Sequence, residues 1–204
     1  MTKFKDEPSA LRDASRELER IRALMERATE YSHLSGVSIV GSGLLAVAGV
    51  AACGFLGIDF GLPGHQRTLA AVWGSVFGIA AVQGTALSVA NARRKAEPAW
   101  SPLTRQVVVA MLPALFTGAA LTAYGLQTGR IDLLPPCWML AYGSSLMGLG
   151  LFAGWRIRLA AVAFLVLGAA SLFLWMDHGL LTMLASFGGL HLALGAWVIW
   201  KPRV

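Results

Sequence analysis

Six long apolar runs, none with a charged residue in its central part, constrain this chain more than any other feature. Each is close to the roughly 20 residues that an α-helix needs to cross about 30 Å of hydrocarbon. The connecting segments are too short for a second folded unit. We therefore expect an all-α, polytopic membrane protein in which residues 34–204 form one bundle, with spans at about 34–57, 68–90, 106–127, 133–153, 157–176 and 180–200.

Composition supports a membrane protein and argues against a nucleic-acid-binding protein. Hydrophobic residues make up 56% of the 204 residues and charged residues only 14%, against about a quarter charged in soluble proteins. The net charge of +6 could indicate a nucleic-acid partner, but that would need the basic residues on one face of a soluble fold. Here they lie in the connectors, so the expected partner is the lipid bilayer and not nucleic acid.

The placement of Lys and Arg predicts the topology. Fifteen of the seventeen lie before the first run, in 91–105, at Arg156 and Arg158, or after 200, all on one side of the predicted bundle. The opposite side holds only Arg67 and Arg130. Because cytoplasmic loops carry the excess of basic residues, we expect both termini in the cytoplasm.

The N-terminal residues 1–33 form the only sizeable segment outside the runs. In 9–30, apolar residues such as Leu11, Leu18 and Met25 recur at alternating spacings of three and four, which predicts an amphipathic cytoplasmic helix. Nothing breaks it before Gly36, so it is expected to run into the first span. Two interpretations stay open: a surface helix on the protein's own loops or on headgroups, and a docking helix for a cytoplasmic protein or for self-association.

Glycine and other small residues suggest how the spans pack. Gly49 and Gly74 are 25 residues apart, as are Gly118 and Gly143, and this spacing suggests three pseudo-repeated hairpins. Small residues four apart let helix backbones approach closely in membranes. The third hairpin has the corresponding pair Gly168 and Gly188, 20 residues apart. The expected contact rows are Gly74 with Gly78, then Ser38, Ser42 and Ala46, then Ala185, Gly189 and Ala193.

One imidazole, His191, lies near the middle of the last span, in "SFGGLHLALGAWVIW". Gly188 and Gly195 share its helix face, so we expect it to face a neighbouring helix. The favoured interpretation is a neutral ring that is hydrogen-bonded to Tyr142. Ser144, Ser145 and a backbone carbonyl are the alternative partners. Intramembrane ionisable groups are often functional, so a ligand contact or proton relay stays open. A haem ligand is the least favoured, because the other three histidines fall at membrane edges.

A second group of candidates lies at the outer edge: Cys53, Cys137, Asp177 and His178. They fall at comparable depth, so a disulfide between the two cysteines, or a metal site using Asp177, His178 and a cysteine, stays open as an alternative. Separate thiols and a polar turn are favoured over both. No catalytic or nucleotide-binding motif occurs in a usable context, so we expect no enzyme activity, no metal and no cofactor.

Three segments carry a resemblance: "ELERIRALMERATEYSHLSG" before the first span, "LPPCWMLAYG" in the fourth and "FGGLHLALG" in the sixth. Together they resemble a family of small bacterial six-helix inner-membrane proteins of unsettled function, whose genes often lie beside one for a winged-helix regulator. The resemblance implies a bacterial inner membrane and places Trp138, Tyr142, Gly189 and His191 in recurring segments. The glycine spacing alone is loosely similar to three-hairpin acid-resistance membrane proteins.

Two functional classes follow, with a third behind them. The first is a membrane sensor or regulatory protein that reports through the N-terminal helix to a cytoplasmic partner. The second is a small-solute or proton-linked transporter or channel, with His191, Tyr142 and Gln83 along its path. The sensor is favoured because ion-coupled carriers need intramembrane charge and none is present. A structural or assembly subunit of a membrane complex is the third.

Overall fold

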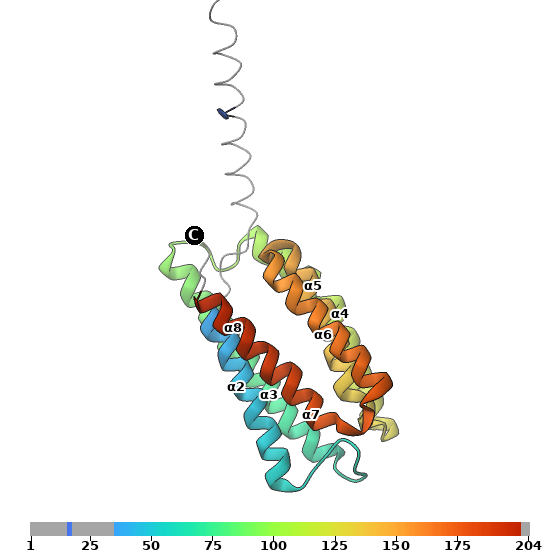
Figure 1. The fold of residues 1–204 in the computed structure, drawn as a ribbon. Coiled ribbons are helices and arrows are strands. Elements are labelled where there is room, and N and C mark those ends of the chain that lie inside the picture. The colour runs from blue at the N-terminus through green and yellow to red at the C-terminus, as the bar shows by residue number, and fades with distance from the viewer. Residues whose placement is uncertain (1–15, 18–34, 201–204) are drawn as a thin grey trace, which may run out of the picture.

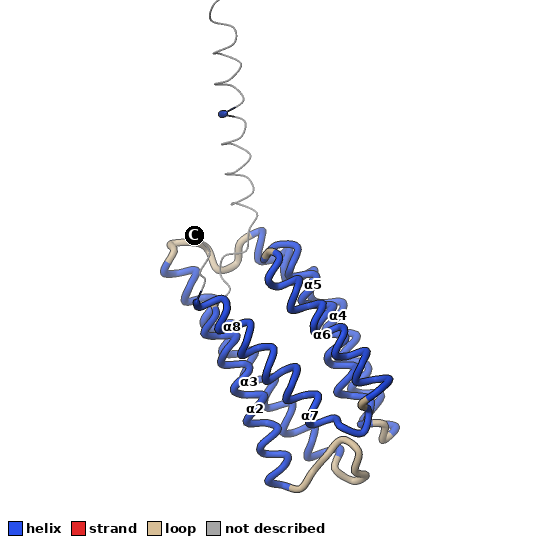
Figure 2. The backbone as a smooth tube through the Cα atoms, in the orientation of Figure 1, coloured by secondary structure: helices blue, strands red, loops and turns tan. Residues whose placement is uncertain are grey.

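The structure is a computed structural model that describes residues 16–17 and 35–200. Every regular element among these residues is helical, as Figures 1 and 2 show. The last four elements follow one another without a loop and together form the last span, Met176–Trp200. The elements are α2 (Gly36–Leu56), α3 (Gln66–Arg94), α4 (Pro102–Thr128), η1 (Ile131–Leu133), α5 (Leu134–Ala153), α6 (Trp155–Leu174), η2 (Met176–His178), α7 (Gly179–Met183), the π-helical η3 (Leu184–Leu190) and α8 (His191–Trp200).

Five of these helices are long and apolar enough to cross a membrane: α2, α3, α4, α6 and the last span. The predicted class, a bundle of apolar membrane helices, is therefore confirmed at this level. The 20-residue α5 is not among the five. It carries polar residues such as Tyr142, Ser144 and Ser145, and about half of its positions are buried between α4 and α6. A helix that faces protein needs fewer apolar residues than one that faces lipid.

Capping residues set the helix boundaries. Ser35 is extended, and its hydroxyl accepts a hydrogen bond from the backbone N–H of Ser38. Ser101 does the same for Thr104, before a proline that suits a first helical turn. The expectation that a helix runs unbroken through residue 35 is wrong, because the Ser35 cap starts α2 afresh. Of segment 9–30, only Arg16 and Glu17 are described, both helical, so its amphipathic helix lies outside the described residues.

The helices divide into two groups that we call the halves. In the first half, α2 lies between α3 and the last span; in the second half, α5 lies between α4 and α6. Figure 1 shows the two groups on opposite sides of the bundle. The predicted hairpins α2–α3 and α4–α5 pack closely along their length, whereas α6 and the last span belong to different halves and meet mainly through side chains. The third repeated hairpin is therefore less closely packed than the other two.

Close packing inside the halves uses one predicted row, Ser38, Ser42 and Ala46, and glycines that lie outside the other two rows. A Cβ on Gly195 would lie 2.7 Å from the backbone nitrogen of Val40, and one on Gly43 would lie 3.0 Å from that of Leu192. The predicted pair Gly74 and Gly78 has nothing within 4 Å of a Cβ at either position. Of the other predicted rows, Ala185, Gly189 and Ala193 are exposed. Since α2 packs on the opposite side of the last span, the row that it uses contains Gly188 and Gly195.

Candidate functional site

Aromatic side chains join the two halves, and we call this contact the seam. It has three clusters along the bundle axis. One lies at the Phe60 end, which carries residues 57–65, 129–133 and 175–178. The second lies in the middle around His191, and the third at the opposite end, the Trp200 end.

The middle cluster holds the one buried histidine among the described residues. His191 is 7% exposed, and its Nε2 shares a hydrogen bond of 2.9 Å with the hydroxyl of Tyr142 on α5. The prediction that Tyr142 is its partner is confirmed. Because His191 belongs to the first half and Tyr142 to the second, this hydrogen bond crosses the seam.

Two phenylalanines complete the middle cluster. Phe164 of α6 presents its ring edge-to-face to Tyr142 at 5.0 Å and to His191 at 5.4 Å between ring centroids. Phe187 stacks on the His191 ring, at 5.9 Å and an interplanar angle of 19°. Neither residue could be predicted from the sequence, because a phenylalanine in an apolar span gives no signal that separates a ring packed on a histidine from one facing lipid.

The local backbone explains how His191 comes to face α5 and α6. The preceding segment, η3, has the wider π-helical winding, which rotates the following residues relative to a regular helix. Gly188 and Gly195, expected to share the helix face of His191, instead face Val47 and Val40 of α2. The prediction of a neighbouring-helix contact was right, but the glycines serve a different neighbour. Segments of this kind occur frequently at functional sites.

The second ring nitrogen of His191 is not fully satisfied. The backbone of Phe187 lies close enough to the His191 ring for a polar interaction. However, Nδ1 is buried and makes no hydrogen bond of regular geometry within the described residues. Of the alternative partners on α5, Ser144 is exposed. Ser145 is fully buried, and its hydroxyl also has no partner in the described part of the chain. The middle of the seam thus keeps unused hydrogen-bonding capacity at His191.

Gln83, the third predicted member of a polar path, lies elsewhere. Its side-chain amide donates to the backbone carbonyl of Ser38 at 3.1 Å and contacts the hydroxyl of Ser42 at 3.2 Å. Gly41 leaves the room that the amide fills. These contacts tie α3 to α2 inside the first half. The structure therefore does not bring Gln83 together with His191 and Tyr142.

At the Phe60 end, the seam is closed by three large rings. Phe60 belongs to the loop between α2 and α3, yet it is only 1% exposed. Its ring centroid lies 6.2 Å from that of Trp73 on α3 and 5.8 Å from that of Trp138 on α5. The indole of Trp138 also donates to Thr122 of α4 at 2.7 Å. Trp138 is half-buried in this cluster.

The four outer-edge candidates are not assembled into one site. Cys53 is fully buried beside the Phe60 cluster, whereas Asp177 and His178 are exposed. Both Cys53 and Cys137 are free thiols, so the alternative of a disulfide between them is wrong. Within residues 16–17 and 35–200, no group of three or more His, Cys, Asp or Glu side chains could hold a metal ion.

The cluster at the Trp200 end is smaller. Trp155 at the start of α6 packs edge-to-face on Trp197 of α8, with ring centroids 5.1 Å apart. The guanidinium of Arg156 lies over the Trp197 ring at 5.4 Å, which is a cation–π geometry. The seam is therefore held by aromatic contacts at both ends and in the middle, together with the Tyr142–His191 hydrogen bond and a second one, of 3.4 Å, from Ser171 on α6 to Thr182 on α7.

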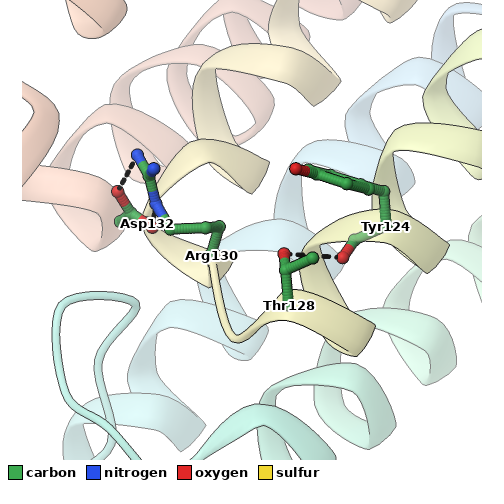
Figure 3. A network of polar contacts seen from close by, with 4 residues as sticks. All are labelled: Tyr124, Thr128, Arg130 and Asp132. Carbon is green, nitrogen blue, oxygen red and sulfur yellow. Dashed lines mark hydrogen bonds and ion pairs between the residues drawn. The ribbon is translucent and has the colours of Figure 1, made fainter.

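A separate polar network lies on the surface of the Phe60 end (Figure 3). Arg130 makes two hydrogen bonds to the carboxylate of Asp132, each of 3.2 Å, and this carboxylate raises the pKa of the Arg130 guanidinium. Thr128 donates to the backbone carbonyl of Tyr124 at 2.8 Å. Both arrangements are exposed and local in sequence, at the end of α4 and in the turn that follows its left-handed C-cap, Gly129.

No family model, curated protein or solved structure matches this chain.

Proposed function

We propose that the chain is a multi-pass membrane protein with six spans and both termini in the cytoplasm, which puts the Phe60 end outside. Five helices are apolar enough to span a membrane. The sixth, α5, packs between two of these five, α4 and α6. The partition of Lys and Arg supports the orientation. The resemblance noted above supports a bacterial inner membrane and membership of that small six-helix family.

Within this framework, the function that the geometry supports best is that of a membrane sensor or regulatory protein. The observation that carries it is the Tyr142–His191 hydrogen bond across the seam. A switch needs an element with two arrangements whose balance a stimulus can shift. Two halves that meet mainly through side chains form such an element. In this proposal the first half carries the signal to the N-terminal segment, because α2 follows that segment directly in the chain.

The transport alternative has weaker support. It needs polar groups in a continuous line through the bundle, and Gln83 is engaged with Ser38 and Ser42 inside the first half. His191 and Tyr142 are enclosed by the rings of Phe164 and Phe187. No described contact favours an assembly subunit over a sensor, so the sensor is the conclusion.

The sensor proposal can be tested by probing the N-terminal segment while changing the seam. A spin label at Ala23→Cys, in a chain with Cys53 and Cys137 replaced by alanine, reports local mobility after reconstitution in vesicles. We expect Tyr142→Phe to change the spectrum, since it removes one hydroxyl from the seam and keeps the ring. The matched control is His178→Gln, which alters an exposed histidine at the Phe60 end and is expected to leave the spectrum unchanged.

An unchanged spectrum in Tyr142→Phe would contradict coupling between the seam and the N-terminal segment. Proton or solute flux through vesicles containing the wild-type protein, lost in His191→Gln, would instead establish the transport alternative. The topology has its own test. A membrane-impermeant thiol reagent added outside should label Arg130→Cys and not Lys95→Cys, and the reverse pattern would overturn the assigned sides.

A further inference from the structure

A surface hollow of about 370 Å³ lies at the Phe60 end, between the start of α3 and the end of α4. One wall is apolar, made by Ala70 and Leu126, and the rest is made by Gln66, Arg67 and Gln127. We call it the interfacial hollow. It lies outside the seam and takes no part in the function proposed above. Its lining combines hydrogen-bond donors, one cation and an apolar surface.

The charge in the hollow is available to a ligand. Arg67 is exposed and has no ion-pair partner within the described part of the chain, whereas Arg130 at the same end is paired with Asp132. The start of α3 adds to this charge. His65 makes no side-chain capping hydrogen bond there, so the first backbone N–H groups of the helix are not capped by it, and a helix N-terminus favours anions.

The surface below the hollow is apolar and belongs to two helices that barely touch. α3 and α4 are the least buried of the five apolar spans: only 11% of the residues in the apolar stretch of each are buried. The two helices also pack very little against each other. Phe77 of α3 and Phe116 of α4 are both exposed, and they lie about two helical turns from Ala70 and about three from Gln127, on the same helix faces. A ligand with a polar head in the hollow can therefore lay an apolar chain along α3 and α4.

We propose that the interfacial hollow binds the phosphate headgroup of an anionic phospholipid, with its acyl chains against α3 and α4. Arg67 supplies the charge-assisted contact to the phosphate, the amides of Gln66 and Gln127 donate to its oxygens, and Leu126 contacts the glycerol or the upper acyl carbons. The proposal rests on the bundle spanning a membrane, and it is independent of any role of His191.

The test is a titration of the purified full-length protein with phosphatidylglycerol, followed by native mass spectrometry of the one-lipid complex. A basic residue near a charged lipid surface contributes enough to change affinity about fivefold. We expect Arg67→Gln to weaken binding by about that factor or more, and Arg67→Lys to restore most of it. The matched control is Arg130→Gln, which removes the paired arginine at the same end and should change binding less than twofold, on the order expected of an exposed pair.

A second arm distinguishes a lipid from a soluble phosphate. Inorganic phosphate and glycerol 3-phosphate, added at millimolar concentration, should not displace phosphatidylglycerol, because neither contacts the apolar surface. Displacement by either would overturn the lipid proposal in favour of a soluble anion. Equal losses in Arg67→Gln and Arg130→Gln would overturn it too, since they would indicate general charge attraction. Because Arg67 is exposed, its substitution should leave the thermal unfolding temperature unchanged, which verifies the fold.

Discussion

The interior of each half and the seam between the halves are packed in different ways. Inside the halves, helices meet through glycine and backbone: a Cβ on Gly148 would lie 2.7 Å from the carbonyl oxygen of Ala110. Across the seam, helices meet through rings whose centroids lie about 5 to 6 Å apart, with one hydrogen bond between Tyr142 and His191 and a longer one of 3.4 Å from Ser171 to Thr182. Backbone contacts leave no freedom to adjust, whereas side-chain contacts can repack. The seam is therefore the place where the bundle can change shape.

The largest effect on stability is expected at Phe60, in the loop between α2 and α3 that closes one end of the seam. Phe60→Ala removes a fully buried ring from the contact between the halves, and a truncation of this kind costs about 3 kcal/mol of unfolding free energy. Leu62→Ala is the control, because this residue of the same loop is 46% exposed. Reversible unfolding in mixed detergent micelles measures both. Equal costs for Phe60→Ala and Leu62→Ala would show that the loop does not hold the halves together.

Overpacking the interior of a half should cost somewhat less. A side chain at Gly195 meets the backbone of Val40, so Gly195→Val forces α2 and α8 apart at a cost of about 2 kcal/mol. Gly74→Ala is the contrasting variant, since a Cβ there meets nothing within 4 Å, and alanine favours a helix over glycine. Loss of stability in Gly195→Val, with none in Gly74→Ala, is the expected pattern in the same unfolding assay.

Trp138 lies in both regions and should show an intermediate effect. Trp138→Phe keeps an aromatic ring against Phe60 but removes the indole N–H that donates to Thr122. The expected loss is about 1 kcal/mol, the net contribution of a typical hydrogen bond. Thr122→Val removes the other partner, so the double variant should cost little more than either single one. Additive costs would mean that the two side chains do not interact.

The smallest effect on stability is expected at His191. Glutamine can keep a hydrogen bond to Tyr142, and interhelical hydrogen bonds in membranes average about 0.6 kcal/mol, so His191→Gln should cost about that much. A loss several times larger would mean that His191 is mainly a packing residue, held by Phe164 and Phe187. A loss as small as predicted would mean that the His191 ring contributes little to stability, which is consistent with its role in the proposed switch.

Features that follow from residue type and depth could be predicted from the sequence. Hydropathy located the five helices that are apolar enough to span a membrane, and the His191–Tyr142 contact followed from two polar groups at matching depth in apolar helices. The division into halves could not be predicted, because any apolar helix face can pack on any other when lipid and protein interiors are equally apolar. The burial of Phe60 was missed for a related reason: a loop phenylalanine carries no periodic signal. The π-helical turn before His191 has no sequence signature, so the role of Gly188 was assigned to the wrong neighbour.

The most direct test of an adjustable seam is a distance measurement between the halves. Spin labels at Arg94 in the first half and Leu159 in the second, both exposed positions, report across the seam by pulsed electron resonance. A second pair at Leu112 and Leu159 lies within the second half. The account predicts that Tyr142→Phe shifts or broadens the first distribution by roughly 2 Å, the scale of helix shifts in switching proteins, and leaves the second unchanged. Identical distributions for the first pair in wild type and Tyr142→Phe would contradict it.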